Sequence, residues 1–310
     1  MQALNWRQKL KPWLLPIAML TGILFHSAID SVQFLAPWLI FAMLLITFCR
    51  IRPSEFRIGK LTVAVVLVQI IGSVVVYFAL KPVGDDIAGG GMICVLCPTA
   101  TAAPVITAML GGSIALLVSI SVLSNLAAAL CAPAFFAMLD SAAAAHISFG
   151  TAFITILAKV GPLILGPMAV AIILLYAAPR VHDTIASHQS LSFYLWAISL
   201  IIVVGRAVSF AMAEPADRIP EMIVLALAAC ILCLLQFYIG HRIGIRYGDA
   251  VAGTQGLGQK NTVLAVWMAV TYLNPICSIA PAAYILWQNT VNSLQLYFKG
   301  RRDAARIQQD

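Results

Sequence analysis

The sequence predicts an all-α membrane protein, and three observations support this fold class. Hydrophobic residues make up 62% of the 310 residues and charged residues only 10%, too few to cover a soluble domain of this size. The mean hydropathy is +0.96. The apolar runs, such as Leu61–Leu80 and Met222–Leu235, are long and continuous, whereas the strands of a membrane barrel alternate apolar and polar residues. Because backbone groups in lipid must be satisfied within the protein, these runs are expected to be helices.

Ten spans are expected, since a bilayer core about 30 Å thick takes about 20 residues of helix. The first apolar run is interpreted as a retained helix, because no small-x-small cleavage site follows it. Connections are short, so no separate soluble domain is expected, and the two sets of five spans divide the chain at 1–140 and 141–310. The predicted spans are 10–28, 33–49, 61–80, 88–110, 114–139, 151–177, 190–212, 221–240, 245–271 and 275–298.

The basic residues between the spans predict an orientation. Cytoplasmic loops are enriched in Lys and Arg, and fourteen basic residues fall on the side of the N-terminus, against only Lys81 and Arg218 on the other side. The fourteen are Arg7, Lys9, Lys11, Arg50, Arg52, Arg57, Lys60, Arg180, Arg242, Arg246, Lys299, Arg301, Arg302 and Arg306. Both termini are therefore expected in the cytoplasm, in a plasma (inner) membrane. Topology and the lipid bilayer account for the net charge of +7, so no nucleic-acid partner is expected.

Three further basic residues, Lys159, Arg206 and Lys260, fall inside predicted spans. Charges at membrane depth are costly and usually functional. Arg206 is close enough to the end of its span for its head group to reach the surface. Lys159 and Lys260 lie deeper, and the sequence leaves the role of Lys159 open.

Metal sites, cofactors and catalysis are not expected. The pairs Cys94/Cys97 and Cys230/Cys233 have the spacing of zinc ligands, but they lie in apolar helices with no His or carboxylate nearby to complete a site. The histidines lie at or near span ends, and Asp249 is the only carboxylate near a helix break. No catalytic constellation follows, so the chain is not expected to be an enzyme.

Two predicted spans are interrupted at matching places, because each is the fourth of its set of five. The first holds two prolines within Cys97–Pro104, and the second holds glycines with Gln, Lys and Asn over Gly248–Asn261. An odd number of spans per set turns the second set upside down, and paired interruptions in inverted halves point to a transporter binding site. Half-helix N-termini in such a site favour anions. The alternative is that 245–261 is a long loop followed by a short helix.

These interruptions resemble a known family. The first is similar to the C-P-G-G-T-x-S-N stretch of the bile acid:sodium symporter family, and the second to its E-x-G-x-Q-N-x-x-L-A segment, with Gly258, Asn261, Leu264 and Ala265 in register. The resemblance covers nearly the whole chain. It implies ten helices in two inverted five-helix repeats, with broken helices 4 and 9 crossing, and transport of organic anions, usually with sodium.

The chain departs from this family at the sodium ligands. The Ser and Asn of helix 4 fall on Ala103 and Pro104, and two hydroxyl ligands of helix 5 fall on Leu117 and Ser121. Gln69 matches the family's sodium-site glutamine.

The ninth span departs further, since the family's Glu falls on Gly256 and its Gln on Lys260. A one-residue shift places them on Gln255 and Gln259, and either alignment loses the carboxylate. A lysine would also repel the ion, at a cost of about 4 kcal/mol for charges about 4 Å apart at a dielectric near 20. Sodium coupling at these positions is therefore not expected.

The expected function is that of a secondary transporter that moves a small organic anion by alternating access, either proton-coupled or uncoupled. Lys260 could stand in place of the sodium ion or release its proton during the cycle. The alternative is that its side chain extends to the cytoplasmic face of the membrane. A sodium-coupled symporter with relocated ligands and a non-transporting receptor or structural protein are the alternatives. The candidate ion-coupling residues are Lys260, Gln69 and Ser121.

The candidate substrate-binding residues come from the two breaks and the last span. In the last span, Gln288, Asn292 and Gln295 share one helical face, which hydrogen bonding between helices would also explain. The candidates are Lys260, Asn261, Gln259, Gln255, Thr99, Thr101, Gln288 and Asn292.

Overall fold

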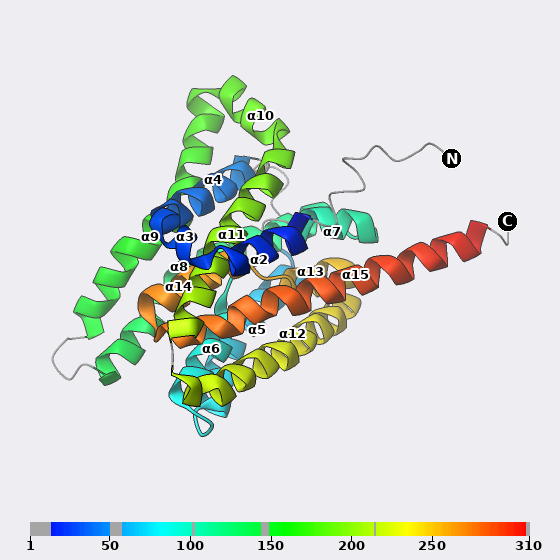
Figure 1. The fold of residues 1–310 in the computed structure, drawn as a ribbon. Helices are drawn as coiled ribbons and strands as arrows, with labels where there is room; N and C mark the ends of the chain where they lie inside the picture. Colours follow the sequence, from blue (N-terminus) through cyan, green and yellow to red (C-terminus); the bar gives the residue numbers. More distant parts are fainter. Residues whose placement is uncertain (1–13, 50–57, 101–102, 144–148, 214, 308–310) are drawn as a thin grey trace.

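The computed structural model describes residues 14–49, 58–100, 103–143, 149–213 and 215–307 (Figure 1). Within these ranges the chain is almost entirely helical and forms no β-strand, which confirms the all-α class. The 3-10 helices are η2 (Asp30–Leu35), η4 (Ala216–Arg218) and η5 (Pro275–Ser278). The α-helices are α2 (Leu14–Leu24), α3 (His26–Ile29), α4 (Ala36–Cys49), α5 (Lys60–Leu80), α6 (Asp85–Leu96), α7 (Ala103–Leu110), α8 (Ile114–Ala143), α9 (Phe149–Ala177), α10 (Pro179–Ser187), α11 (Gln189–Ala213), α12 (Ile219–Tyr247), α13 (Ala250–Gly258), α14 (Thr262–Tyr272) and α15 (Ile279–Ile307).

Within the described ranges, four helical segments are long and apolar enough to cross a membrane. They are Ser31–Cys49, Lys60–Leu80, Ile114–Ala137 and Ala216–Tyr247. Nine of the ten predicted spans overlap one helix or two consecutive helices, and the ninth overlaps three, the end of α12 with α13 and α14. The number of membrane crossings stays a prediction. Two segments are interrupted as expected, α6 from α7 and α13 from α14.

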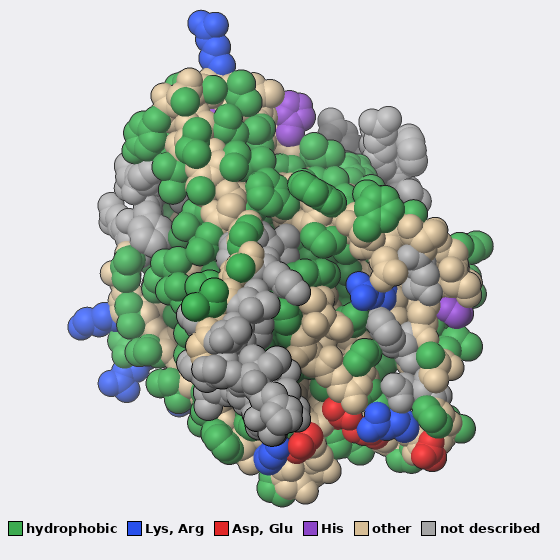
Figure 2. All heavy atoms as spheres, turned by 90° about the vertical axis from the view of Figure 1, so that its left-hand side faces the viewer, with side chains coloured by type: hydrophobic (Ala, Val, Ile, Leu, Met, Phe, Trp, Pro, Cys, Tyr) green, Lys and Arg blue, Asp and Glu red, His purple; other side chains and the backbone are tan. Residues whose placement is uncertain are grey.

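Helix α5 shows how the helices face their surroundings. Its exposed face is apolar and includes Leu67, Ile71 and Val75, whereas Gln69 and Ser73 are buried on the other face. This is the reverse of a helix at the surface of a soluble protein and suits contact with lipid. Figure 2 shows hydrophobic side chains over much of one face of the molecule, with the acidic side chains gathered near its lower edge.

The ninth span differs from its prediction. The glycine-rich stretch was expected to be irregular from Gly248 to Asn261, but α12 continues to Tyr247 and α13 is helical up to Gly258. Gly248 ends α12 in the left-handed region at φ +99°, as a glycine readily does. The other glycines allow close packing: a Cβ at Gly253 would lie 2.5 Å from the carbonyl oxygen of Gly240. Small residues at such a contact let two helix backbones approach.

Two other differences concern lengths. The predicted eighth span ended at residue 240, whereas α12 runs seven residues further because it packs along α13. The connection after the sixth span contains a short helix, α10, that was not predicted.

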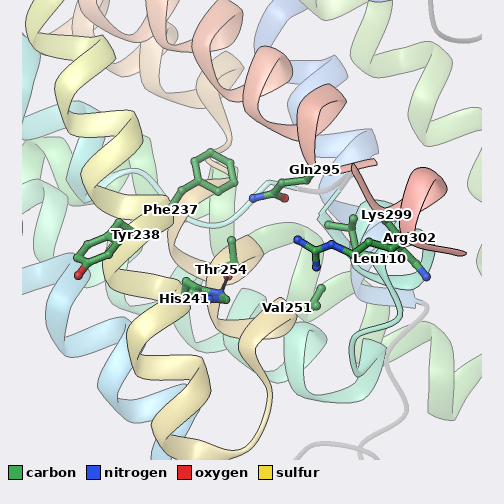
Figure 3. Close-up of a pocket in the computed structure, with 9 residues that line it drawn as sticks. All are labelled: Leu110, Phe237, Tyr238, His241, Val251, Thr254, Gln295, Lys299 and Arg302. Atoms are coloured by element: carbon green, nitrogen blue, oxygen red, sulfur yellow. Dashed lines mark hydrogen bonds between the residues drawn. The ribbon is translucent and has the colours of Figure 1, made fainter. Parts of the chain in front are cut away.

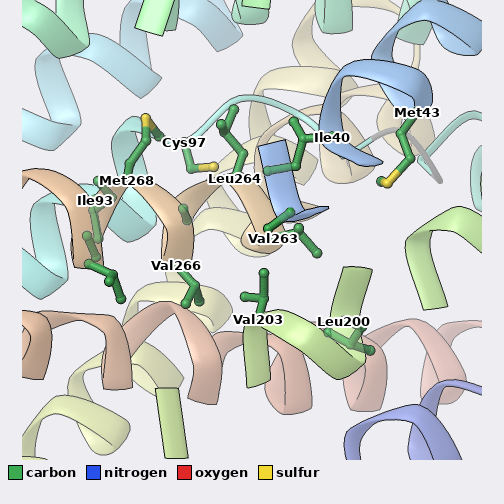
Figure 4. Close-up of a cluster of buried hydrophobic side chains, with 14 of the residues drawn as sticks. Ile40, Met43, Ile93, Cys97, Leu200, Val203, Val263, Leu264, Val266 and Met268 are labelled. Atoms are coloured by element: carbon green, nitrogen blue, oxygen red, sulfur yellow. The ribbon is translucent and has the colours of Figure 1, made fainter. Parts of the chain in front are cut away.

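Helix α14 lies in the largest hydrophobic cluster, among side chains of α4, α6, α8 and α11. In Figure 4, Val263 and Val266 of α14 point toward Val203 of α11, while Leu264 and Met268 lie on the other side of the helix. Helix α13 belongs to a separate cluster with α5 and α8. The second interruption therefore connects two helices that are packed in different clusters. The packing of these two helices fixes where the second interruption meets the first.

Candidate functional site

The two helix interruptions meet. Residues 97–100 and 259–261 lie outside the helices, and Thr99 pairs with Lys260 in an isolated antiparallel β-bridge. The amide of Ala100 donates to the carbonyl of Gln259 at 2.9 Å, and the amide of Asn261 donates to the carbonyl of Pro98 at 2.8 Å. The backbones thus satisfy one another where neither is helical, as irregular backbone inside a membrane protein requires.

The first interruption follows from the hydrogen-bonding capacity of three consecutive residues. Pro98 has no amide hydrogen and cannot continue α6. The amide of Thr99 donates to the hydroxyl of Ser124 at 3.0 Å rather than to a carbonyl one turn back. The amide of Ala100 is used by Gln259. The last carbonyls of α6 are left without helical partners.

Side chains from other helices supply the missing donors. Nε2 of Gln236 lies 3.4 Å from the carbonyl oxygen of Cys94. Nζ of Lys260 lies 2.9 Å from that of Val95. Nε2 of Gln69 lies 2.7 Å from that of Leu96. The C-terminal end of α6 is therefore capped by α12, by the second interruption and by α5.

The end of α13 is capped in a reciprocal way. The hydroxyl of Thr99 donates to the carbonyl of Gly256 at 2.7 Å, and the hydroxyl of Tyr284 donates to that of Gly258 at 2.8 Å. Thus Thr99 caps the half-helix α13, and its bridge partner Lys260 caps the half-helix α6. Each interruption provides a side chain that satisfies the other.

The crossing, as residues 97–100 and 259–261 together are called below, contains one charged side chain, that of Lys260. Its side chain is 1% exposed and is among the largest fully buried side chains. The bonded carbonyl of Val95 belongs to the negative end of α6, a favourable position for a cation. Its nitrogen therefore lies at the carbonyl end of a half-helix rather than at an N-terminal end. In the part of the chain that is described, no carboxylate pairs with it.

The ion-coupling candidates on α5 and α8 have other partners. Gln69 uses both ends of its amide, because its Oε1 accepts from the Ser124 hydroxyl at 2.6 Å while its Nε2 donates to Leu96. Ser121 is buried and its carbonyl accepts from Asn125 at 2.7 Å. Ser124, one turn further along α8, is the hydroxyl that joins the crossing.

The candidates on α15 face the second interruption. Oε1 of Gln288 accepts from the amide of Lys260 at 2.9 Å. Nε2 of Gln255 donates to Oε1 of Gln295 at 2.8 Å. Asn292 lies between these contacts and is buried, and neither polar atom of its side chain has a hydrogen-bond partner among the described residues.

The remaining candidates are partly connected. Oε1 of Gln259 and Nδ2 of Asn261 are buried without a hydrogen-bond partner in the described part of the chain, whereas Oδ1 of Asn261 caps α14 at the amide of Leu264. Thr101 lies outside the described residues, and Lys159 lies in α9 but its side chain is not described.

Sequence reasoning missed Ser124, Gln236 and Tyr284. Gln236 bonds both the Cys94 carbonyl and, at 3.1 Å, the hydroxyl of Tyr284. A glutamine directly after the apolar run that ends at Leu235 was the available signal, because a buried amide needs a partner. Chemically, the crossing offers one buried ammonium and several amides. Among the described residues no group of three or more metal-ligating side chains gathers.

The family comparison matches most of the chain. The model of the SBF-like CPA transporter family aligns with residues 49–291, which include both interruptions, α5 and the first half of α15. No curated protein matches the chain.

Proposed function

Because the chain belongs to the SBF-like CPA transporter family, we propose that it carries a small organic anion across the membrane by alternating access, without sodium at the family's usual ligand positions. The bilayer is then a plasma (inner) membrane with both chain termini in the cytoplasm. The two inverted halves, 1–140 and 141–310, supply the two crossing helices.

Lys260 is the observation that carries this proposal. Its ammonium is buried at the crossing and bonds the carbonyl of Val95 at 2.9 Å. In the bile acid:sodium symporter family, which the chain resembles, a sodium ion is expected near the corresponding breaks. A covalently attached cation in this region attracts an anion without a soluble co-ion, and charge-assisted hydrogen bonds to it are strong.

The packing around the second interruption argues against a sodium ligand set. Gly256, which aligns with the family's glutamate, is packed so tightly that a Cβ there would lie 2.9 Å from a side-chain carbon of Ile120. Ala103 and Leu117 are buried and have no side-chain oxygen. A hard cation such as sodium prefers several oxygen ligands, and the lysine charge opposes its binding.

The test is transport by the purified chain in proteoliposomes. A thermal-stabilisation screen of small carboxylates and sulfonates selects the probe, and its uptake is then measured with sodium, potassium or choline at constant ionic strength. We expect uptake that is unchanged by the cation. A steep sodium dependence would instead favour a symporter with relocated ligands, and saturable binding without uptake or counterflow would favour a receptor.

A further inference from the structure

A pocket of about 530 Å³ opens at the end of the molecule where α15 carries its basic residues. It lies between α7, α12, α13 and α15, away from the bridge of Thr99 with Lys260. Its walls include the apolar side chains of Leu110, Phe237 and Val251, and its polar lining includes His241 and Arg302. Figure 3 shows Lys299 and Arg302 together on one side of the pocket, opposite His241 and Thr254.

This lining has the character of a site for an amphipathic anion. Ligand pockets combine apolar walls with a few placed polar groups, and volumes of 300–1,000 Å³ are typical. Arg302 is always charged and presents a planar set of donors that matches a carboxylate or a sulfonate.

A row of polar side chains leads from this pocket toward the crossing. Gln295 lines the pocket and accepts a hydrogen bond from Gln255, which is fully buried. One turn deeper, Gln259 follows Gln255 directly after the end of α13, and Asn292 precedes Gln295 on α15. Both are buried, and they hold polar atoms with no partner among the described residues.

The row ends at the crossing itself. Gln288, one turn beyond Asn292, accepts from the backbone amide of Lys260 at 2.9 Å. Buried amides without partners are rare because each costs free energy. The unpartnered atoms lie between two hydrogen bonds, Gln255 to Gln295 and Lys260 to Gln288. We take them to mark a place that another polar group occupies at some stage.

We propose that the pocket is a second anion-binding site, for a small carboxylate or sulfonate with an apolar body, and that the hydrogen bond between Gln255 and Gln295 is a gate between it and the crossing. The site's role as an entrance for the carried anion rests on the proposed function. The presence of the site and of the gate does not, so each can be measured without transport.

The anion site is tested by charge-selective labelling of a Val251→Cys variant. Methanethiosulfonates that carry a sulfonate or a trimethylammonium group are compared, with wild type as the background for the native cysteines and a small free thiol as the intrinsic reference. We expect the ratio of the sulfonate labelling rate to the trimethylammonium labelling rate to be higher for Val251→Cys than for the free thiol. Adding Arg302→Gln should lower the advantage of the sulfonate reagent roughly fivefold, the effect of about 1 kcal/mol for a unit charge about 4 Å away in water.

Benzenesulfonate should slow the labelling of Val251→Cys by competition, and an uncharged benzene sulfonamide should not. If the two reagents label Val251→Cys in the same ratio as they label the free thiol, or if Arg302→Gln leaves that ratio unchanged, the anion site is overturned. Elution as a single peak in detergent confirms that each variant is folded, and Leu110→Cys replaces Val251→Cys if the latter is not.

The gate is tested with a neutral thiol reagent on Asn292→Cys. We expect slow labelling, which Gln295→Ala accelerates at least tenfold because it removes the acceptor of Gln255. Gln295→Glu retains an acceptor oxygen and should leave the labelling slow. Equal rates in the Ala and Glu backgrounds would refute the gate whether or not the protein transports anything.

Discussion

Thr99 and Lys260 have roles that are linked by their pairing. Each caps a half-helix that belongs to the other interruption, Thr99 at the carbonyl of Gly256 and Lys260 at that of Val95. An unsatisfied buried polar group costs about 1–3 kcal/mol. The crossing is therefore held by side chains as well as by the two backbone hydrogen bonds, and a substitution at either residue acts on both helices.

Lys260→Gln separates the charge of this residue from its hydrogen bond. Gln retains a donor for the carbonyl of Val95 but removes the ammonium. We expect a folded protein whose affinity for the selected anion falls about tenfold to a hundredfold, because hydrogen bonds to a charged group are worth about 1.5–3 kcal/mol. Calorimetric binding in detergent measures the loss.

Lys81→Gln is the matched control, because Lys81 is exposed and pairs with Asp85, the first residue of α6, at the opposite end of that helix from the crossing. It should bind as wild type does. Retained binding in Lys260→Gln together with lost pH-driven accumulation would assign the lysine to proton transfer instead, and unchanged binding and uptake at every pH would remove it from the mechanism.

Thr99→Val should destabilise the protein by about 1–3 kcal/mol, since it leaves the Gly256 carbonyl buried without the hydroxyl partner. Thr99→Ser keeps the hydroxyl and should lie close to wild type. Thermal unfolding in one detergent, followed by tryptophan fluorescence, orders the three proteins. If Val and Ser variants unfold at the same temperature, the hydroxyl has no capping role.

Among the elements, α13 has a conformation that the sequence concealed. Its glycines suggested irregular backbone, yet residues Ala252–Gly258 are all buried and helical. Helix propensity was overridden by close packing against Gly240 and Gly244. The helical periodicity of an isolated segment gives its faces, but it cannot show that Gly253 will meet a second helix whose own glycines allow the approach.

Prediction succeeded where a covalent constraint acts locally. Pro98 removes an amide hydrogen wherever the chain goes, so the break after α6 was predictable. A buried lysine was equally visible as an exception in an apolar span. The partners that cap α6 come from positions as distant as Gln69, Gln236 and Lys260, and no spacing within one helix identifies a partner on another.

Asp249 connects two helix starts. Its Oδ1 caps α13 at the amide of Ala252, and its Oδ2 accepts from the amide of Ser113 just before α8, both at 2.7 Å. This places the only carboxylate that the sequence showed near a break in a structural role, outside the crossing.

Asp249→Ala should lower the stability by about 1–2 kcal/mol, because it removes a helix cap and a second, part-buried acceptor contact. Asp249→Asn keeps one side-chain oxygen and should lie between Ala and wild type. Hydrogen exchange should quicken first at the amides of Ser113 and Ala252. Faster exchange spread evenly over the helices, with no excess at these two amides, would contradict the local role.

At the scale of the whole molecule, ion pairs gather at the end that is expected to face away from the cytoplasm. Lys81 and Arg218, the basic residues expected away from the cytoplasm, are both neutralised by acids: Lys81 by Asp85 at 2.6 Å, and Arg218 by Asp86 at 3.1 Å and by Glu221 at 3.0 Å. Asn274 also donates to Asp86 at 3.0 Å. These contacts tie α6, η4 and the turn before η5 together at one end.

The same charges make the topology testable. Translocated segments are poor in Lys and Arg, so the turn with Lys81 and Val83 should lie outside the cell and the end of α12 with Arg242 and Arg246 inside. In intact cells, Val83→Cys should react with a membrane-impermeant maleimide, and Ile245→Cys should react only after permeabilisation. Both positions are exposed, so access decides the result, and wild type measures the native cysteines.

Reporter fusions that fluoresce only in the cytoplasm should give signal at both termini. A C-terminus on the opposite side from the N-terminus would require an odd number of crossings. The two interrupted helices could not then occupy matching places in two inverted five-helix halves, and alternating access by those halves would fall with the span count.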